Sequence, residues 1–188
     1  MNSPSIKRLN QELLNNIAQQ ARTSPRLRQN YNFHDLTEKV QRFINVLQPG
    51  TYIRPHRHLR VTGVNGFEFF LVCQGELGII ILNESGEILD RELVSANGAV
   101  RGIELPEGTY HTLVALAPDT MILELKEGPY DSTTDKEFLD AFPLEGTDAA
   151  GQLVETWSSY FKGETRDEVG ETSSKSSSPQ PLTPNQVT

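Results

Sequence analysis

A succession of short β-rich runs fills the middle of this 188-residue chain and constrains its fold more than any other feature. Between residues 40 and 128, runs of Val, Ile, Leu and Phe are separated by turn sequences such as Pro49-Gly50, Gly75 and Pro118-Asp119. Many short strands with no helix between them are typical of antiparallel sandwiches and barrels. The sequence therefore predicts an all-β fold.

An amphipathic helix is predicted ahead of the β-rich region. Apolar residues recur at helical spacing over 5–21, namely at Ile6, Leu9, Leu13, Leu14 and Ile17. Ser3-Pro4 provides a start and Ser24-Pro25 a stop. The apolar face of this helix must cover either its own barrel or a partner.

The C-terminal part of the chain is predicted to contain a short helix followed by a low-complexity tail. Residues 132–146 are interpreted as a short terminal helix. Residues 147–188 are rich in Ser, Thr, Pro and charge, so we expect disorder, with Trp157, Tyr160 and Phe161 as exceptions that could dock weakly. We divide the chain into an N-terminal helix and connecting loop (1–39), a β-barrel (40–131), a short terminal helix (132–146) and a low-complexity tail (147–188).

Composition excludes several classes of function. The net charge of −8 argues against non-specific binding to nucleic acid or to an anionic membrane. Cys73 is the only cysteine, so an internal disulfide is impossible. There is no run of about 18 apolar residues for a membrane span, and the N-terminal segment lacks the apolar core of a signal peptide. We expect a cytoplasmic protein with a small-molecule ligand and no nucleic-acid or membrane partner.

Three histidines and one glutamate have the spacing of a metal site. His56 and His58 are separated by one residue, so on an extended strand both imidazoles face the same side. Glu68 lies in the next apolar run and His111 in a later one. Imidazoles and a carboxylate suit one divalent transition metal, Fe, Mn, Ni, Co or Zn. Because a long segment separates it from His58, Glu68 would either coordinate the metal or orient a ligand.

Strand alternation also predicts which residues lie beside the metal. If His56 and His58 face inward, Tyr52 and Arg54 do so as well. Arg54 would either clamp a carboxylate or phosphate group of a substrate or form a structural ion pair.

The same alternation on the other strands places Phe70 and Val72 on the face of Glu68. It places Leu113 on the face of His111, with Tyr110 outward.

Two further residues are candidates for substrate binding. His34 lies in a polar, basic loop that would either reach the site or remain solvated. Arg101 would either pair with Glu104 or line the pocket. Both possibilities stay open, because the sequence does not define which residues of that strand face inward.

The spacing of these residues resembles the two motifs of the cupin superfamily. The first motif corresponds to Gly50-x5-His56-x-His58-x9-Glu68-x6-Gly75 and the second to Pro106-x-Gly108-x2-His111. The departures are a longer gap between His58 and Glu68, Val100 in place of an opening Gly, and Ala115 in place of a closing Asn. The resemblance implies a double-stranded β-helix, or jelly-roll barrel, and favours a homodimer.

A closer resemblance extends over about 24–142. The segments NYNFH, LQPGTYIRPHRH, FFLVCQGELGIII, RGIELPEGTYHTLVAL and KEGPYD are similar to the WbuC family of cupin-fold metalloproteins. That family tends to occur with bacterial surface-polysaccharide genes. The resemblance therefore implies a metal-binding barrel linked to polysaccharide biosynthesis.

The leading hypothesis is a metalloenzyme that acts on a small anionic or sugar-derived substrate. A sugar isomerase or epimerase and a dioxygenase fit equally well, and residues 59–67 would gate access to the site. One alternative is a non-catalytic, metal-dependent sugar-binding or sensor module. Another is a structural homodimer with a vestigial metal site.

Overall fold

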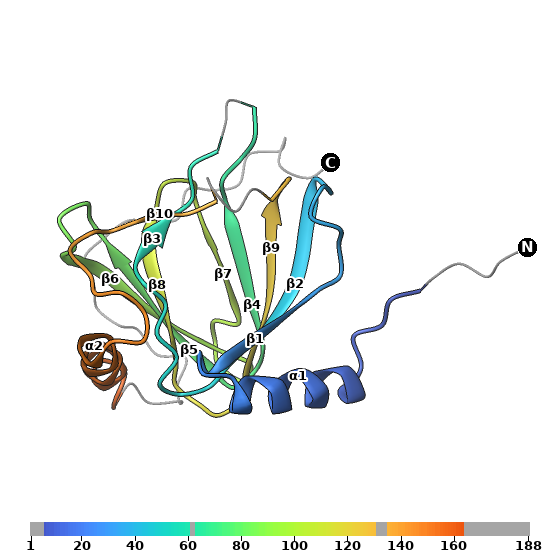
Figure 1. Cartoon of the computed structure of the whole chain (residues 1–188), viewed down its shortest axis with the longest axis horizontal. Coiled ribbons are helices and arrows are strands. Elements are labelled where there is room, and N and C mark those ends of the chain that lie inside the picture. The colour runs from blue at the N-terminus through green and yellow to red at the C-terminus, as the bar shows by residue number, and fades with distance from the viewer. Residues whose placement is uncertain (1–5, 61–62, 131–134, 164–188) are drawn as a thin grey trace, which may run out of the picture.

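Two antiparallel five-stranded sheets face each other in the computed structural model, which describes residues 6–60, 63–130 and 135–163 (Figure 1). The first sheet has the order β1 (Arg28–Asn32), β2 (Val40–Leu47), β9 (Thr120–Glu127), β4 (Glu68–Gln74) and β7 (Gly102–Leu105). The second has the order β10 (Glu137–Phe138), β3 (His56–Arg57), β8 (Tyr110–Ala115), β5 (Glu76–Leu82) and β6 (Ile88–Ser95). Apart from the consecutive pairs β1–β2 and β5–β6, neighbours in each sheet are distant in sequence, as in a jelly-roll barrel. The predicted all-β cupin-type fold is confirmed.

Side-chain alternation along the strands fills the barrel. On β5, Leu77 and Ile79 point into the core between the sheets, where Phe70 and Val72 of β4 meet them. Ile80 of β5 faces the opposite way and is also fully buried, under a second apolar cluster. A strand that is buried on both faces is a continuous apolar run in the sequence, as β5 is.

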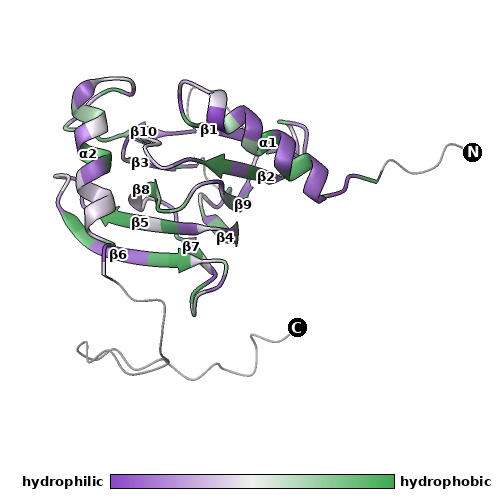
Figure 2. Cartoon of the chain, turned by 90° about the horizontal axis from the view of Figure 1, so that it is seen from below, coloured by the Kyte–Doolittle hydropathy of each residue, from purple (hydrophilic) through white to green (hydrophobic). Residues whose placement is uncertain are grey.

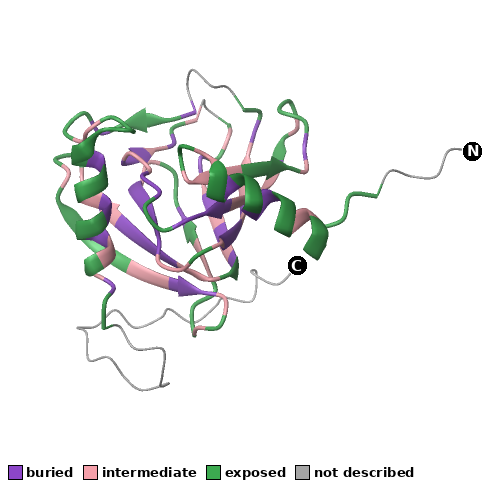
Figure 3. Ribbon diagram, turned by 60° about the horizontal axis from the view of Figure 1, so that its bottom comes forward, coloured by how far each residue is buried: buried purple, intermediate pink, exposed green. Residues whose placement is uncertain are grey.

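Helix α1 (Gln11–Thr23) covers the outer face of the first sheet. Its residues Ile17, Ala18 and Ala21 pack against Ile44 and Val46 of β2. Of the two partners left open by the sequence, the apolar face thus covers its own barrel. Figure 3 shows the buried side of the helix against the strands.

The boundaries of α1 agree with the prediction at one end only. The side chain of Asn10 accepts a hydrogen bond from the backbone N–H of Leu13 at 3.0 Å, so the helix begins after Asn10. Residues 6–10 are not helical, and the predicted start at Ser3-Pro4 lies outside the described residues. The predicted stop is confirmed at Ser24, which precedes Pro25.

A second helix, α2 (Asp148–Ser159), occupies part of the segment expected to be disordered, so that expectation is wrong for 148–159. The Trp157 ring is stacked on Tyr52, with centroids 5.8 Å apart and planes at 8°. The Phe161 ring lies against Gly78 of β5, where an added Cβ would come within 2.4 Å of the ring. Both helices alternate apolar and polar residues along their turns (Figure 2). The polar composition of 147–188 as a whole hides this amphipathic stretch; residues 164–188 lie outside the described part.

The helix predicted over 132–146 is also wrong where the chain is described. Residues 135–146 contain β10 and turns, while 131–134 fall outside the described residues. Glu137 and Phe138 pair with Arg57 and His56, and this long-range pairing overrides the local helical pattern. Strand β1, expected as a loop, likewise exists because it pairs with β2 along its length.

No helix in the described ranges is long and apolar enough to cross a membrane.

We predict that Trp157→Ala destabilises the protein by about 3–5 kcal/mol, because it opens a cavity in the cluster beneath α2. Chemical denaturation monitored by circular dichroism measures this change. Glu155→Ala, on the exposed side of the same helix, serves as the matched control and should leave stability nearly unchanged. Equal midpoints for the two variants would show that α2 does not contribute to folding.

Candidate metal centre and its cavity

The pairing of β3 with β8 brings the three candidate histidine ligands together. His56 lies directly opposite His111 in this ladder, and their ring centroids are 4.7 Å apart. The ring of His58 lies 5.1 Å from that of His56, centroid to centroid. All three side chains are almost completely buried. The extended geometry predicted for His56 and His58 thus turns both imidazoles into the barrel.

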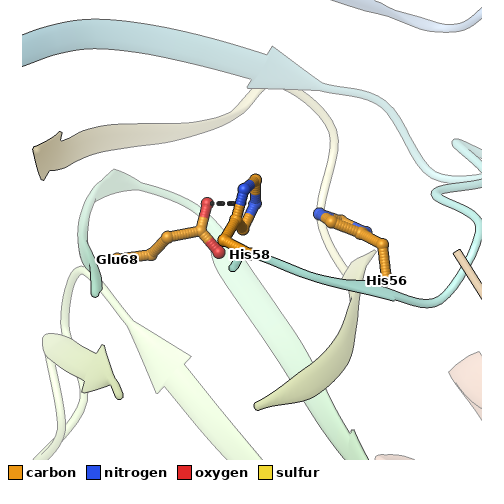
Figure 4. Close-up of side chains that lie close together, drawn as sticks. All are labelled: His56, His58 and Glu68. Atoms are coloured by element: carbon orange, nitrogen blue, oxygen red, sulfur yellow. Dashed lines mark ion pairs between the residues drawn. The ribbon is translucent and has the colours of Figure 1, made fainter. Parts of the chain in front are cut away.

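Glu68, at the start of β4, completes the cluster. Its Oε1 lies 3.0 Å from His58 Nε2 and its Oε2 lies 3.1 Å from His111 Nε2. Figure 4 shows the carboxylate against His58, with the His56 ring directed toward the pair. One ligand atom each from His56, His58 and Glu68 can be chosen so that all lie within 4.8 Å of one another. These residues form a candidate metal site, and the long segment before Glu68 does not remove it from the cluster.

The segment 59–67 is anchored to the barrel. The Glu107 carboxylate accepts hydrogen bonds from the backbone N–H groups of Arg60 and Gly66, at 2.6 and 3.2 Å. These contacts hold the pKa of Glu107 below its ordinary value. None of the described residues 59, 60 and 63–67 lines the cavity at the site. The predicted gating role of this loop therefore has no support in its position.

Backbone carbonyls fix the orientation of two of the imidazoles. His56 Nδ1 lies 2.9 Å from the carbonyl oxygen of Arg54, and His111 Nδ1 lies 3.0 Å from that of Thr109. Because a carbonyl can only accept a hydrogen bond, Nδ1 carries the proton in each ring. The neutral ring then keeps its lone pair on Nε2. This arrangement is typical of histidines that bind a metal.

His58 has buried nitrogens whose hydrogen-bonding capacity is not used. Its Nε2 is close to Glu68, but the direction is not that of a hydrogen bond, and neither ring nitrogen has a hydrogen-bond partner among the described residues. Nδ1 lies 3.7 Å from Asp135 Oδ2. Leaving such atoms unsatisfied is costly. A cation between His58 and Glu68 would satisfy both groups, so the residues present fit a bound metal.

Burial sets the charge state of the cluster. It lowers the pKa of His56 well below the ordinary value, and the neighbouring charge of Lys136 adds to this effect. Burial also lowers the pKa of His58, despite its contact with Glu68. For Glu68 itself, burial would raise the pKa, but the contacts with His111 and His58 outweigh it and hold the pKa well below the ordinary value. Neutral imidazoles at His56 and His58 beside an ionised carboxylate suit the binding of a divalent metal.

Three members of the cluster, His56, Glu68 and His111, line a cavity of about 750 Å³. Side chains from β2, β4, β8 and β9 line it, together with residues of the segment around β10. The charged residues in this lining are Arg26, Arg28, Arg54, Glu68, Glu124, Lys126, Asp135, Lys136 and Glu145. Five of them, Glu124, Lys126, Asp135, Lys136 and Glu145, were not identified from the sequence.

Strand β9 supplies two of the missed residues. Glu124 and Lys126 are buried and share the inward face with Ile122. Burial, and then the negative charge of Glu68, raise the pKa of Glu124 to about 8. In the run TMILELKE, Glu124 and Lys126 alternate in phase with the core residue Ile122. This pattern could have revealed both residues from the sequence.

Asp135, in the segment before β10, forms two ion pairs close to the cluster. Its carboxylate lies 2.8 Å from the Arg60 guanidinium and 3.1 Å from Lys126 Nζ. Burial would raise the pKa of Asp135, but Lys126, His58 and Arg60 lower it below the ordinary value. No local sequence signal identifies Asp135, since its partners come from other strands.

Two of the four residues predicted to bind substrate line the cavity. Arg54 does so, with its guanidinium 5.4 Å from the centroid of the Phe138 ring. His34 does so as well, and its Nδ1 lies 2.9 Å from both the backbone nitrogen and the carbonyl oxygen of Arg42. The sequence left both possibilities open for His34, and it is buried rather than solvated.

The other two, Tyr52 and Arg101, lie outside this cavity. Tyr52 packs under α2, and its hydroxyl donates to the carbonyl of Pro143 at 2.8 Å. Residues 51–55 precede β3 and are not strand, so the two-residue alternation that predicted an inward Tyr52 does not extend to it. Arg101 is exposed at the start of β7. By contrast, Leu113 is inward and Tyr110 outward on β8, as predicted.

Comparison with known proteins gives one family match. A family described as a domain of unknown function, DUF6016, matches residues 9–94. The match includes His56, His58 and Glu68 and ends before His111. No curated protein matches the chain.

Several solved structures are similar to the barrel. KdgF from Halomonas sp. is 22% identical, with a TM-score of 0.44, over 59% of this chain and 86% of that one. A cupin superfamily protein from Desulfitobacterium hafniense DCB-2 is 12% identical, with a TM-score of 0.41, over 53% and 76%. The capsular polysaccharide assembling protein CapF from Staphylococcus aureus is 23% identical, with a TM-score of 0.48, over 58% of this chain. The similar region spans only 29% of CapF.

We predict that the protein, purified without chelator, carries about one divalent transition-metal ion per chain. The double variant His56→Ala plus His111→Ala should lose most of it, because two of the imidazoles are gone. Mass spectrometry of the metal content measures both. His34→Gln is the control, since it removes a cavity histidine outside the cluster and should retain the metal. Equal metal content in wild type and double variant would contradict the assignment of the site.

Proposed function

We propose that the protein is a metal-dependent enzyme that acts on a small anionic or sugar-derived substrate. The observation that carries this proposal is the convergence of imidazoles and a carboxylate beside a cavity large enough for such a ligand. His56, His58, Glu68 and His111 would hold the metal. When bound, a divalent metal in such a site polarises a carbonyl or hydroxyl group or binds dioxygen.

The charges around the cavity favour an anionic substrate. Five cationic side chains line it against four carboxyl groups, although the whole chain has a net charge of −8. One of the four, Glu124, has a pKa raised to about 8 by burial and by Glu68, so it is mostly protonated at neutral pH. The cavity is therefore locally positive in a protein that is negative overall. A positive pocket raises the local concentration of anionic ligands.

Arg54 is the residue that would orient the substrate. Its terminal nitrogen lies 3.3 Å from Asp140, whose side chain is fully exposed, so this ion pair contributes little. Its Nε is buried with no hydrogen-bond partner in the part of the chain that the structure describes. Arg26 and Arg28, in contrast, both contact Glu145. The Arg54 guanidinium thus has donors left for a carboxylate or phosphate group.

Two types of reaction are compatible with the proposal. A sugar isomerase or epimerase linked to surface-polysaccharide synthesis is supported by the sequence resemblance to the WbuC family. A dioxygenase is supported by the ligand set of the metal. The homodimer and the cytoplasmic location expected from the sequence stay predictions.

We predict that turnover of a nucleotide sugar, screened with and without oxygen, depends on the metal and is lost after treatment with chelator. Arg54→Met should lower kcat/KM by tenfold or more, since a charge-assisted hydrogen bond contributes about 1.5–3 kcal/mol. Arg101→Met, an exposed arginine outside the cavity, should match wild type. Steady-state kinetics after metal analysis of each variant provide the measurement.

Two other results would reject the proposal as stated. Micromolar binding without turnover on any substrate would favour the non-catalytic sensor module. Equal losses in the Arg54 and Arg101 variants would show that net charge, rather than a contact with the substrate, decides the rate.

A further inference from the structure

A lysine directly before β10, Lys136, lines the cavity at the metal cluster. In its antiparallel pairing with β3, Phe138 lies opposite His56 and Glu137 opposite Arg57. Residues opposite each other in such a ladder share a face. Lys136, two residues before Phe138, is therefore on the same face as the inward imidazole of His56, and it lines the cavity.

The register continues beyond the two paired residues. The backbone N–H of Leu139 donates to the carbonyl of Pro55 at 2.9 Å, in the same phase as the ladder. The next pair in this phase, Asp140 and Arg54, is joined by their side chains. Lys136 and Arg54 are thus two cations beside this short ladder, and both line the cavity together with Phe138.

Lys136 differs from the other cavity lysine in its partners. Lys126 Nζ lies 3.1 Å from Asp135, so its charge is paired. Lys136 has no hydrogen bond or ion pair with any other described side chain, although its charge acts on His56 and Glu68 nearby. It is solvent-accessible in the cavity, so a ligand can reach it. Desolvation within the cavity lowers the pKa of Lys136, against the opposing effect of the negative charge of Glu68, so the ammonium would gain from a further anionic partner.

Hydrophobic residues stand beside polar ones, such as Arg26 and Glu145, among the exposed residues that line the cavity. Four exposed hydrophobic residues line it, namely Leu36, Tyr130, Phe138 and Leu144. The Phe138 ring is 44% exposed and its centroid lies 5.9 Å from that of His56. A ring-shaped ligand could stack on Phe138 while its charged group reaches Lys136.

We propose that Lys136 is a second anion-binding residue of the site, and that the ligand is a ring-bearing compound with a carboxylate or phosphate group rather than a neutral sugar. This inference rests on the proposed function, because it places the ligand beside the metal cluster. A divalent metal would add positive charge there, which further favours an anion over a neutral ligand.

The test compares three probes with the same ring: glucose, glucuronate and glucose 6-phosphate. Calorimetry on the metal-loaded full chain should show that one of the two anionic probes binds at least about tenfold more tightly than glucose. Which of them binds decides between carboxylate and phosphate. Glucose binding as tightly as both anions, or no binding of either anion, would overturn the inference.

The Lys136→Met variant tests whether Lys136 itself accounts for the preference for anionic probes. Met keeps the length of the side chain and removes the charge, so affinity for the anionic probe should fall about tenfold, with metal content and the affinity for glucose unchanged. Lys162→Met, beyond α2 and outside the cavity lining, removes the same charge and should bind like wild type. Wild-type affinity in Lys136→Met, an equal loss in Lys162→Met, or loss of metal in Lys136→Met would each overturn the role of Lys136.

Failure of the proposed function has a different signature. If wild type carries no metal, or if His56→Ala plus His111→Ala binds the anionic probe unchanged, the metalloenzyme proposal fails. The contribution of Lys136 to anion binding would then still be measured by its own variant.

Discussion

The pairing of β3 with its two neighbours is the contact on which the site depends. β3 has only two residues, His56 and Arg57, yet β8 lies on one side of it and β10 on the other. The first pairing places His56 opposite His111, and the second brings the cavity segment around Lys136 to the same face. Because a strand this short has few hydrogen bonds of its own, side-chain contacts must hold it. The carbonyl of Arg54 and the ion pair between Arg57 and Glu137 do so.

Charge is distributed unevenly between the surface and the interior of this barrel. Buried charges are expensive, and most of those in the cavity are paired, as Asp135 is with Arg60 and Lys126. Among the described residues, the buried groups without a hydrogen-bond partner are the nitrogens of His58 and the Nε atoms of Arg54, Arg57 and Arg60, all on the segment that carries the histidine pair. Unsatisfied polar groups gathered in one place indicate a site that is completed by what it binds.

The sequence predicted what depends on local periodicity and missed what depends on long-range pairing. Alternation along the strands put Glu68 with Phe70, and His111 with Leu113, on inward faces as observed. It failed for Tyr52, because the chain before Pro55 is not a strand. Strand β10 and α2 were missed because their pairing and packing partners, β3 and the cluster around Ile80, are distant in sequence. Lys136 was missed for the same reason, since the side on which its side chain lies is known only once the register of β10 against β3 is known.

The stacking of Trp157 on Tyr52 connects a peripheral helix to the chemistry of the cavity. Tyr52 is two residues from Arg54, and the carbonyl of Tyr52 accepts a hydrogen bond from Arg28 at 2.7 Å, so α2 braces the backbone that carries the guanidinium we propose to bind an anion. Local opening of α2 would release that backbone and raise the entropic cost of binding. By the reciprocity of linked equilibria, a ligand held by Arg54 would in turn slow the opening of α2. The last helix of the described chain is thus thermodynamically part of the binding site, although none of its residues lines the cavity.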